Sequence, residues 1–164
     1  MPPAGITYRP KTDADRPFLS DLYASTRSEE MAMVPWTPEQ KAEFLAMQFA
    51  AQWSHYEQYY PDADFLVVEA EGRPIGRIYI DRGPDDILLV DIALMPDQRG
   101  KGIGRQMMQE LLDEAAAAGK NVVIHVERYN PALHLYQRLG FEPVGESGVY
   151  YEMRWSPSSR AAIS

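Results

Sequence analysis

The feature that most constrains the fold lies in the second half of the chain, where strand-like and helix-like segments alternate. Residues Ile87–Met95 are apolar on both faces, which is typical of a central strand covered from both sides. A helix is expected from about Gly102 to Ala118, because apolar residues recur there at helical spacing and Gly119 follows as a stop signal. Asn121–Val126 is then expected to be the next strand. A strand, a helix and a second strand in this order place two parallel neighbours in one sheet.

The remaining segments predict further strands and helices around this unit. Phe65–Ala70 and Pro74–Asp81 are expected to pair as a hairpin through a tight turn at Glu71-Gly72. Pro38 suits the first turn of a helix that runs to about Tyr59. Other expected elements are a strand at Ile6–Arg9, a helix at Asp13–Thr26, an irregular segment at Ser28–Trp36, a short helix with Asn130-Pro131 in its cap and first turn, and strands near Phe141–Gly145 and Val149–Trp155. The pattern predicts an α/β chain with a parallel strand pair inside a mixed sheet.

Length and composition favour one domain. A chain of 164 residues with 45% hydrophobic residues suits a single core, and we expect the domain to occupy residues 1–155. Residues 156–164 are small and polar and are expected to form a flexible C-terminal tail. No apolar run approaches the ~20 residues of a membrane span, and the N-terminus lacks the apolar core of a signal peptide. These features predict a cytoplasmic protein.

Charge and cysteine content exclude several kinds of partner and site. With 16 basic and 24 acidic residues, the chain carries a net charge of −8. This charge repels phosphate backbones and anionic membranes, so neither nucleic acid nor a membrane is an expected partner. The chain has no cysteine, which rules out disulfides, thiolate metal sites and a cysteine nucleophile. We therefore expect no metal, and cationic small molecules or peptides fit the charge better.

A glycine-rich segment directly follows the apolar strand. Its residues are Arg99, Gly100, Lys101, Gly102, Ile103, Gly104 and Arg105. Glycine lets a backbone approach a ligand closely, and the start of the following helix adds partial positive charge. Together with the three basic side chains, these features predict a cradle for an anion. The alternative is a glycine turn whose basic residues lie on a solvated helix start.

Two nucleotide-binding motifs are excluded at this loop. The dinucleotide fingerprint requires a third glycine at the position that Arg105 occupies. The phosphate loop of nucleotide hydrolases requires serine or threonine after Gly-Lys, and here Gly102 follows Lys101. The anion must therefore belong to another kind of ligand.

Two motifs resemble those of the GNAT superfamily of acyl-CoA-dependent N-acetyltransferases. The pattern Arg-x-x-Gly-x-Gly, from Arg99 to Gly104, resembles the pyrophosphate loop of that family. The segment from Val126 to Phe141 resembles its other motif, with a strand valine, Asn130, and then Ala, Tyr136 and Gly-Phe. The step from Asn130 to Tyr136 is six residues, whereas many members have seven. The resemblance covers about residues 65–155.

The resemblance implies a fold and a binding site for acetyl-CoA. The expected sheet is mixed and mostly antiparallel, is flanked by helices, and splays between the two parallel strands, where acetyl-CoA enters. Ile92 would lie near the acetyl oxygen, Leu94 against the pantetheine arm, and Asn130 near that arm or the phosphates. The residues assigned to acetyl-CoA in this way are Ile92, Leu94, Arg99, Gly100, Lys101, Gly102, Ile103, Gly104, Arg105 and Asn130. Each has an alternative: the two strand residues are core whatever the function, and Asn130 is a good helix cap without a ligand.

The same resemblance places Tyr136 opposite the thioester sulfur. A tyrosine with a pKa near 10 is a weaker acid than a thiol near 8.5, so a hydrogen bond to the departing sulfur is the safer role. General acid catalysis requires that its pKa be lowered. The alternative is packing against Phe141.

The general base has two candidate residues, His125 and Asp91, and a chain of water molecules is the alternative to both. Some family members carry a glutamate at the position of Leu88, which cannot take a proton. Asp91 is a charge in an apolar run, with a buried arginine partner or a backbone cap as its alternative explanation. His125 stands where ribosomal-protein N-terminal acetylases carry a catalytic glutamate, and a lone strand histidine can also be structural. A nearby carboxylate such as Glu127 or Asp91 would raise its pKa.

The resemblance predicts transfer of an acetyl group from acetyl-CoA to a primary amine on a small molecule, peptide or protein. One alternative is a non-catalytic acyl-CoA-binding sensor of the same fold, and another is an unrelated binder of phosphate ligands. The acceptor pocket is expected at Ser28–Pro38 and Trp53–Tyr60, where no pattern names the amine. A homodimer is the alternative to a monomer.

Overall fold

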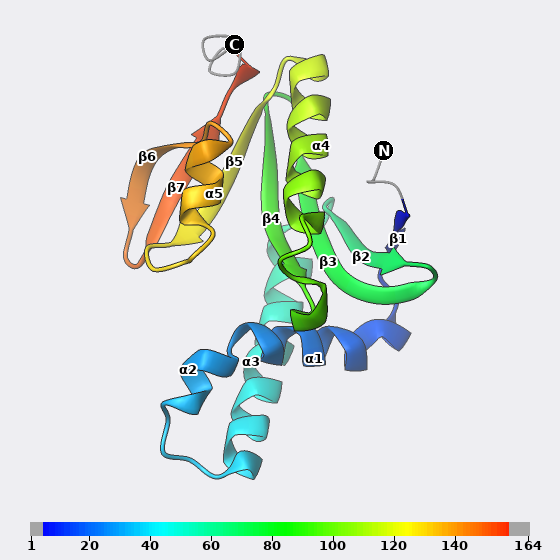
Figure 1. Ribbon diagram of the computed structural model, residues 1–164, viewed down its shortest axis with the longest axis vertical. Coiled ribbons are helices and arrows are strands. Elements are labelled where there is room, and N and C mark those ends of the chain that lie inside the picture. Colours follow the sequence, from blue (N-terminus) through cyan, green and yellow to red (C-terminus); the bar gives the residue numbers. More distant parts are fainter. Residues whose placement is uncertain (1–4, 158–164) are drawn as a thin grey trace.

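A computed structural model describes residues 5–157, which build one seven-stranded sheet with helices on both faces (Figure 1). The strands lie in the order β1-β2-β3-β4-β5-β7-β6, and within this part of the chain β4 and β5 are the only parallel neighbours. The strands are β1 (Ile6–Pro10), β2 (Asp64–Ala70), β3 (Arg73–Arg82), β4 (Asp86–Leu94), β5 (Asn121–Glu127), β6 (Glu142–Ser147) and β7 (Tyr150–Trp155). The helices are α1 (Arg16–Thr26), α2 (Ser28–Ala32), α3 (Pro38–Tyr59), α4 (Ile103–Ala118) and α5 (Leu133–Arg138), with short 3-10 turns η1 (Asp13–Asp15) and η2 (Pro96–Gln98). The expected mixed, mostly antiparallel sheet is confirmed.

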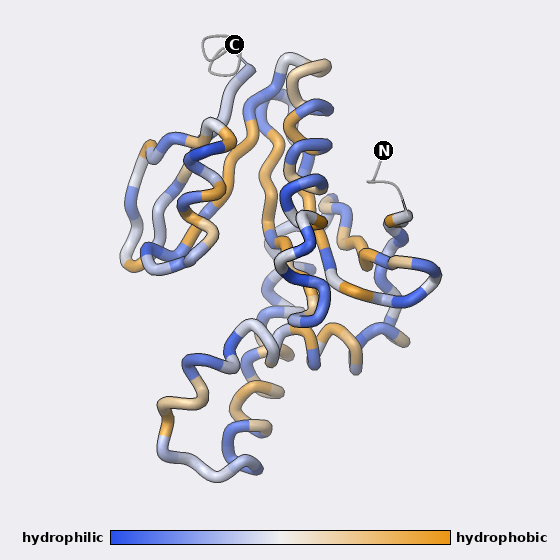
Figure 2. The backbone as a smooth tube through the Cα atoms, in the orientation of Figure 1, coloured by the Kyte–Doolittle hydropathy of each residue, from blue (hydrophilic) through white to orange (hydrophobic). Residues whose placement is uncertain are grey.

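The two faces of the sheet have separate cores. On one face, α4 and α5 pack on alternate residues of the central strands, such as Ile87 and Leu89 of β4 and Ile124 of β5. On the other face, a smaller cluster joins α1 and α3 through Leu22, Phe49 and other side chains, and packs against the end of β4. Figure 2 shows the apolar colour concentrated along β4, β5 and the inner side of α4. The central strands are therefore covered on both faces, as their apolar sequences predict.

The parallel pair of strands comes apart part-way along its length. Pairing between β4 and β5 runs from Asp86↔Asn121 to Leu89↔Ile124 and then stops, and Figure 1 shows the two strands diverging beyond that point. Just there, β4 shifts register against β3, since Tyr79 pairs with Asp91 and Ile80 with Leu89. The extra residue, Val90, forms a bulge, which bends a strand and increases its local twist. The bulge and the splay together open a gap at the centre of the sheet.

Helix boundaries follow local sequence signals where those signals are strong. α3 begins at Pro38 because Thr37 caps it: the Gln40 N–H donates to the Thr37 hydroxyl at 3.2 Å, and the Gln40 side chain accepts from the Thr37 N–H at 3.0 Å. α4 ends at Ala118 because Gly119 adopts a left-handed conformation, with φ of 67°. Both helices have the predicted lengths to within a residue.

Two expectations about local structure were wrong. The segment predicted to be irregular contains α2, whose Met31 is buried, so tertiary packing holds a short helix there. Asn130 does not cap α5, because the N-cap is Ala132. Its side-chain oxygen instead accepts the Ala132 N–H at 2.8 Å, forming a turn just before the helix. Of the expected tail, residues 158–164 lie outside the described residues.

Candidate active site

The glycine loop between β4 and α4 leaves backbone N–H groups unpaired at one end of the gap. Gly100 and Gly102 have φ values of 76° and 82°, and nothing lies within 4 Å of an added Cβ at either residue. They are therefore required for the backbone conformation rather than for clearance. The first helical hydrogen bond of α4 runs from the Gln106 N–H to the Gly102 carbonyl at 3.0 Å. The N–H groups of Ile103, Gly104 and Arg105 consequently have no partner within the helix.

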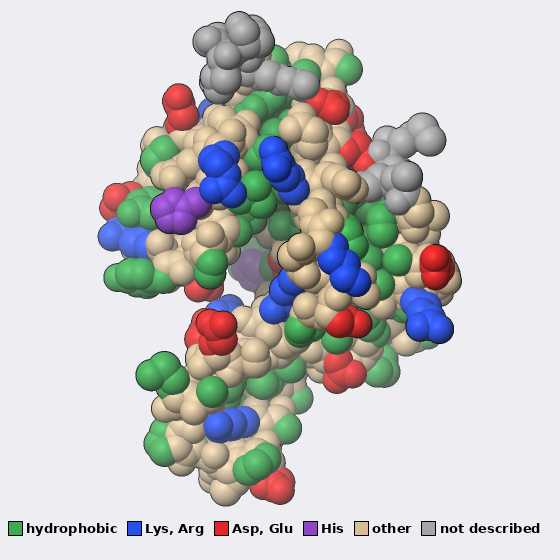
Figure 3. All heavy atoms as spheres, in the orientation of Figure 1, with side chains coloured by type: hydrophobic (Ala, Val, Ile, Leu, Met, Phe, Trp, Pro, Cys, Tyr) green, Lys and Arg blue, Asp and Glu red, His purple; other side chains and the backbone are tan. Residues whose placement is uncertain are grey.

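The three cations of this loop have different environments. Lys101 and Arg105 are exposed, and within residues 5–157 neither side chain makes an ion pair or hydrogen bond. Arg99 instead donates from Nε to the Leu94 carbonyl at 3.0 Å and from Nη2 to the Ser25 hydroxyl at 3.3 Å. Its side chain thus fastens the loop to the end of β4 and to α1. Figure 3 shows Lys and Arg side chains along the rim of a hollow between the loop, α5 and the α2 segment.

The far end of β4 directs two backbone N–H groups into the gap. The Met95 N–H donates to the Ile75 carbonyl of β3 at 2.8 Å. Backbone groups of successive strand residues point alternately to the two neighbouring strands. The N–H groups of Ile92 and Leu94 therefore point toward β5, beyond the place where the β4–β5 pairing ends. The side chains of both residues pack in the core beneath α4.

Tyr136 approaches the gap from α5. Its ring packs edge-to-face on Phe141, with the centroids 5.9 Å apart, and the residue is 8% exposed. Its hydroxyl makes no hydrogen bond within residues 5–157, and the hydroxyl oxygen is not fully buried there. Burial, and then the Asp91 carboxylate, raise the pKa of Tyr136 to about 12. The hydroxyl therefore stays protonated and can donate a hydrogen bond.

Asp91 forms an ion pair on the face of the sheet that α3 covers. Its Oδ2 contacts Nη2 of Arg77, which is 3% exposed, and accepts from the Tyr56 hydroxyl at 3.4 Å. Arg77 also donates to Gln52 at 3.0 Å. Burial, and then Asp91, raise the pKa of Tyr56, so this hydroxyl also stays protonated. A buried arginine partner was the structural explanation considered for Asp91, and the structure contains that partner.

His125 lies at the apex of the gap and is exposed to solvent. It is the first residue of β5 beyond the last pair with β4. Val122, Ile124 and Val126 face the core beneath α4, so His125 faces the opposite side, as Asp91 does. Its Nε2 lies 3.4 Å from Oε1 of Glu152, the residue directly opposite on β7. The neighbouring carboxylate is thus Glu152, whereas Glu127 pairs with Arg27 and Asp91 with Arg77.

Two other residues border this side of the gap. Glu127 contacts Arg27, at the start of α2, at 3.4 Å, which joins β5 to the helices across the hollow. Asn130 uses its side-chain oxygen in the turn before α5. Its amide nitrogen makes no hydrogen bond within residues 5–157 and can donate to a ligand.

Several functional candidates were missed by sequence reasoning. Arg77 and Tyr56 hold Asp91, and Gln52 accepts a hydrogen bond from Arg77. The one available signal was a lone arginine within the apolar strand from Ile75 to Ile80. The Glu152 contact depends on the pairing of β5 with β7, which no local pattern specifies.

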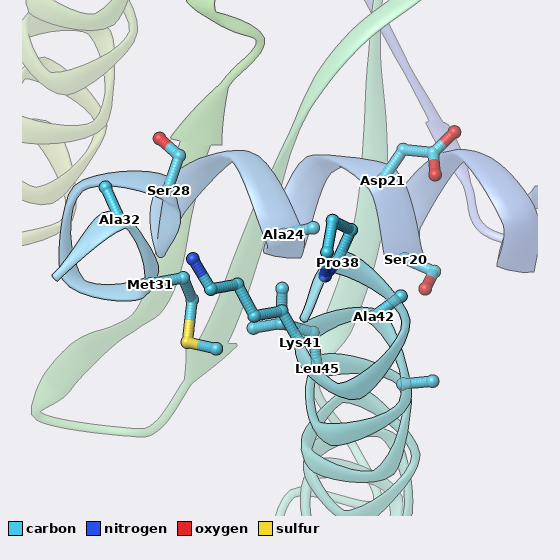
Figure 4. A pocket seen from close by; sticks show the side chains of 11 residues that line it. Ser20, Asp21, Ala24, Ser28, Met31, Ala32, Pro38, Lys41, Ala42 and Leu45 are labelled. Carbon is cyan, nitrogen blue, oxygen red and sulfur yellow. The ribbon is translucent and has the colours of Figure 1, made fainter. Parts of the chain in front are cut away.

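An open pocket of about 550 Å³ lies between α1, α2 and α3 (Figure 4). Lys41 extends beside Met31 at one end, and Asp21 lies at the other. None of the residues predicted for catalysis or for acetyl-CoA binding lines it, so the pocket is separate from the gap between β4 and β5. Its lining does include Ser28, Met31, Ala32 and Pro38, from one of the two segments where the acceptor pocket was expected. Within residues 5–157, no group of His, Asp or Glu side chains is arranged to hold a metal ion. No helix in the same range combines the length and hydrophobicity of a membrane span.

Residues 21–141 match the family model described as Acetyltransferase (GNAT) family. The chain belongs to the GNAT family. It is 30% identical over 117 residues to a Bacillus subtilis (strain 168) protein named as a candidate [ribosomal protein bS18]-alanine N-acetyltransferase, covering 66% of this chain and 77% of that relative. A shorter match, 50% identical over 52 residues, is to the L-amino acid N-acyltransferase MnaT of Escherichia coli (strain K12) and covers 30% of each chain.

A solved structure shares the fold of this GNAT chain. The PaiA N-acetyltransferase of Thermoplasma acidophilum, in complex with coenzyme A, superposes with a TM-score of 0.69 at 19% identity, covering 92% of this chain and 98% of that one. The family predicted from the glycine loop and the second motif is confirmed, and so is its fold.

Proposed function

We propose that this GNAT chain transfers an acetyl group from acetyl-CoA to a primary amine. The observation that carries the proposal is the gap between β4 and β5, which ends at the glycine loop. Unpaired N–H groups and the free cations Lys101 and Arg105 lie at the loop end of the gap, and the Tyr136 hydroxyl approaches it from α5. Such an arrangement suits a long ligand with phosphates at one end and a reacting group at the other.

The residues present fit acetyl-CoA. The backbone from Arg99 to Gly104 and the start of α4 would hold the pyrophosphate, with Lys101 and Arg105 adding positive charge. The N–H groups of Ile92 and Leu94 would hold the acetyl oxygen and the pantetheine arm. The amide nitrogen of Asn130 would add one hydrogen bond to that arm or to a phosphate. Arg99 contributes its backbone, since its guanidinium is already engaged with Leu94 and Ser25.

The bound thioester supplies an electrophilic carbonyl and a thiolate leaving group. Tyr136 would donate a hydrogen bond to the departing sulfur. With its pKa near 12 and that of a thiol near 8.5, full proton transfer would be uphill by about 5 kcal/mol. Tyr136 therefore acts as a hydrogen-bond donor, which stabilises charge without giving up its proton.

The acceptor amine must lose a proton before it attacks. A lysine-like amine with a pKa near 10.4 is neutral in only about one molecule in a few thousand at pH 7. His125 and Asp91 are the two candidate bases, and both face the side of the sheet opposite α4 and α5. His125 is the better candidate, because it is exposed and Asp91 is engaged with Arg77 and Tyr56. We place the acceptor on this side, next to α1 and α2.

The acceptor class is supported by the relatives, which are named for acting on amines of proteins or amino acids. We also propose that the protein is cytoplasmic and that residues 1–155 form a single domain. The identity of the amine acceptor and the choice between a monomer and a homodimer belong to the same proposal.

Incubation of the purified chain with acetyl-CoA and a panel of amines tests this function. We expect release of free thiol that depends on one class of amine, together with a product heavier by one acetyl group in mass spectrometry. Binding of acetyl-CoA with no turnover on any amine would favour the acyl-CoA sensor.

A further inference from the structure

We propose that Glu152 is a positioning residue for His125: it fixes the tautomer of the imidazole and stabilises its protonated form. The inference rests on the proposed function, in which His125 is the base. The two residues are directly opposite each other on β5 and β7, where side chains of an antiparallel pair share one face of the sheet. Nε2 of His125 and Oε1 of Glu152 are 3.4 Å apart.

The contact determines which ring nitrogen can accept a proton. An ionised carboxylate has no hydrogen to donate, so Nε2 must carry the proton that joins the two side chains. In the neutral imidazole, Nδ1 is then the nitrogen with a free lone pair. His125 is thus held in the form that can take a proton from an ammonium group at Nδ1.

Glu152 has no competing partner. Within residues 5–157, His125 is the only side chain that makes a hydrogen bond or ion pair with its carboxylate. Its neighbour on β6 is Gly145, which has no side chain, and a Cβ placed there would meet that of Glu152 at 4.0 Å. The partner strand β6 therefore places no side chain beside Glu152, whose carboxylate turns toward His125 on β5.

The other charged groups near His125 are already paired. On β5, Glu127 contacts Arg27, which also binds Glu30 of α2. On β4, Asp91 is held by Arg77 and by Tyr56 of α3. These pairs leave Glu152 as the carboxylate that responds when the imidazole becomes charged.

Arg154, two residues beyond Glu152 on β7, is likewise engaged, because it lies 3.7 Å from Asp86 of β4.

Each proton is accounted for in the resulting step. The ammonium of the acceptor gives one proton to Nδ1 of His125, and the imidazolium is stabilised by Glu152 until it releases that proton to solvent. The neutral amine forms the C–N bond as the C–S bond breaks. The second proton of the nitrogen ends on the thiolate, giving an amide and a free thiol.

The test compares wild type with Glu152→Gln and with the matched control Glu146→Gln. Glu146 is an exposed carboxylate on β6 that binds Arg128, so its loss changes the net charge equally without touching His125. Glutamine keeps the shape of Glu152 but can offer either a donor or an acceptor to the ring. Glu146 is exposed and Glu152 is half-buried, and both variants keep the size of the side chain, so both are expected to fold.

The first measurement is the tautomer of the His125 ring, read by nitrogen-15 NMR on the protein without acetyl-CoA. We expect the Nε2–H form in wild type and in Glu146→Gln, and a mixture in Glu152→Gln. An unchanged tautomer in that variant would overturn the inference.

The second measurement is kcat/KM against pH with a lysine-like acceptor. Glu152→Gln should lose about three- to thirtyfold in kcat/KM. His125→Ala and the double variant His125→Ala/Glu152→Gln should have equal activity, because Glu152 acts only through the ring. A further loss in the double variant would contradict this. If wild type acetylates no amine, the proposed function fails. The NMR measurement of the His125 tautomer would still show whether Glu152 holds the ring.

Discussion

The two sides of the central gap present different chemical groups, backbone N–H groups on one side and charged side chains on the other. On the side of α4 and α5, the glycine loop and the end of β4 offer backbone N–H groups, which any sequence that reaches the same φ values can provide. On the side of α1, α2 and α3, the gap is bordered by charged side chains in pairs, such as Arg77–Asp91 and Arg27–Glu127. Under the proposed function, the first side would hold the ligand common to many relatives, while the second side would determine which amine is accepted.

The largest expected effect is on the backbone-built side. Gly102→Asp places a carboxylate where the pyrophosphate would bind, and it should abolish thermal stabilisation by coenzyme A. In wild type, ligand at 100 times its dissociation constant should add roughly 2.7 kcal/mol to the free energy of unfolding, whereas NAD and ATP should add nothing. Gly102→Asn is the matched control, because asparagine tolerates the left-handed conformation without the charge. Equal stabilisation of Gly102→Asp and wild type would show that the loop does not hold the phosphates.

The next largest effect is on the stability of the charged side. Asp91→Asn leaves the buried Arg77 without its counter-charge, so the free energy of unfolding should fall by about 3 kcal/mol. Denaturation by urea measures the loss, and stabilisation of the folded variant by coenzyme A should be unchanged. A variant that keeps its stability but loses all turnover would instead identify Asp91 as the base.

Tyr136→Phe tests the residue that reaches the gap between the two sides. Removing the hydroxyl should lower kcat by about 10- to 1000-fold and leave the affinity for coenzyme A nearly intact. Because the pKa of Tyr136 is raised to about 12, the hydroxyl stays protonated up to about pH 10, and it should cause no fall in rate on the alkaline side. An unchanged kcat, with chemistry shown to be rate-limiting, would leave Tyr136 with its packing on Phe141 alone.

The smallest of these effects concerns His125. His125→Ala should lose at least tenfold in kcat/KM for a lysine-like acceptor at pH 7, because the neutral imidazole that accepts the proton is removed. The loss should shrink as the pH rises toward the pKa of the amine, because the acceptor then needs no base. Full activity of His125→Ala at pH 7 would give the histidine a structural role.

The same division explains what could be predicted from the sequence. The glycine loop, Pro38 in a first helical turn and the stop at Gly119 are local signals, and the corresponding elements were predicted with their boundaries. The pairing of Arg77 with Asp91 depends on the register between β3 and β4 and on the bulge at Val90. Such contacts cannot be read from spacing along one segment, because shifting a strand by one residue moves its side chains to the other face.

The side-chain contacts of the glycine loop were also only partly predictable. The sequence predicts a cationic role for Arg99, and its place in the loop is as expected, but its guanidinium binds Leu94 and Ser25. Ser25 is distant in sequence and comes near only after α1 packs on the sheet. The α2 helix was missed for the same reason, since burial of Met31 holds it.

The short ladder between β4 and β5 has a consequence for how the molecule opens. The sheet consists of two sub-sheets, β1-β2-β3-β4 and β5-β7-β6, whose direct hydrogen-bonded seam runs only from Asp86↔Asn121 to Leu89↔Ile124. Cooperative opening units in proteins often coincide with such supersecondary blocks. Amide hydrogens of β7 should therefore exchange at rates different from those of β3, with α4 as the covalent crossover between the two blocks. A ligand that bridges the gap would slow amide exchange in both sub-sheets, because it would link them where the β4–β5 hydrogen bonds are missing.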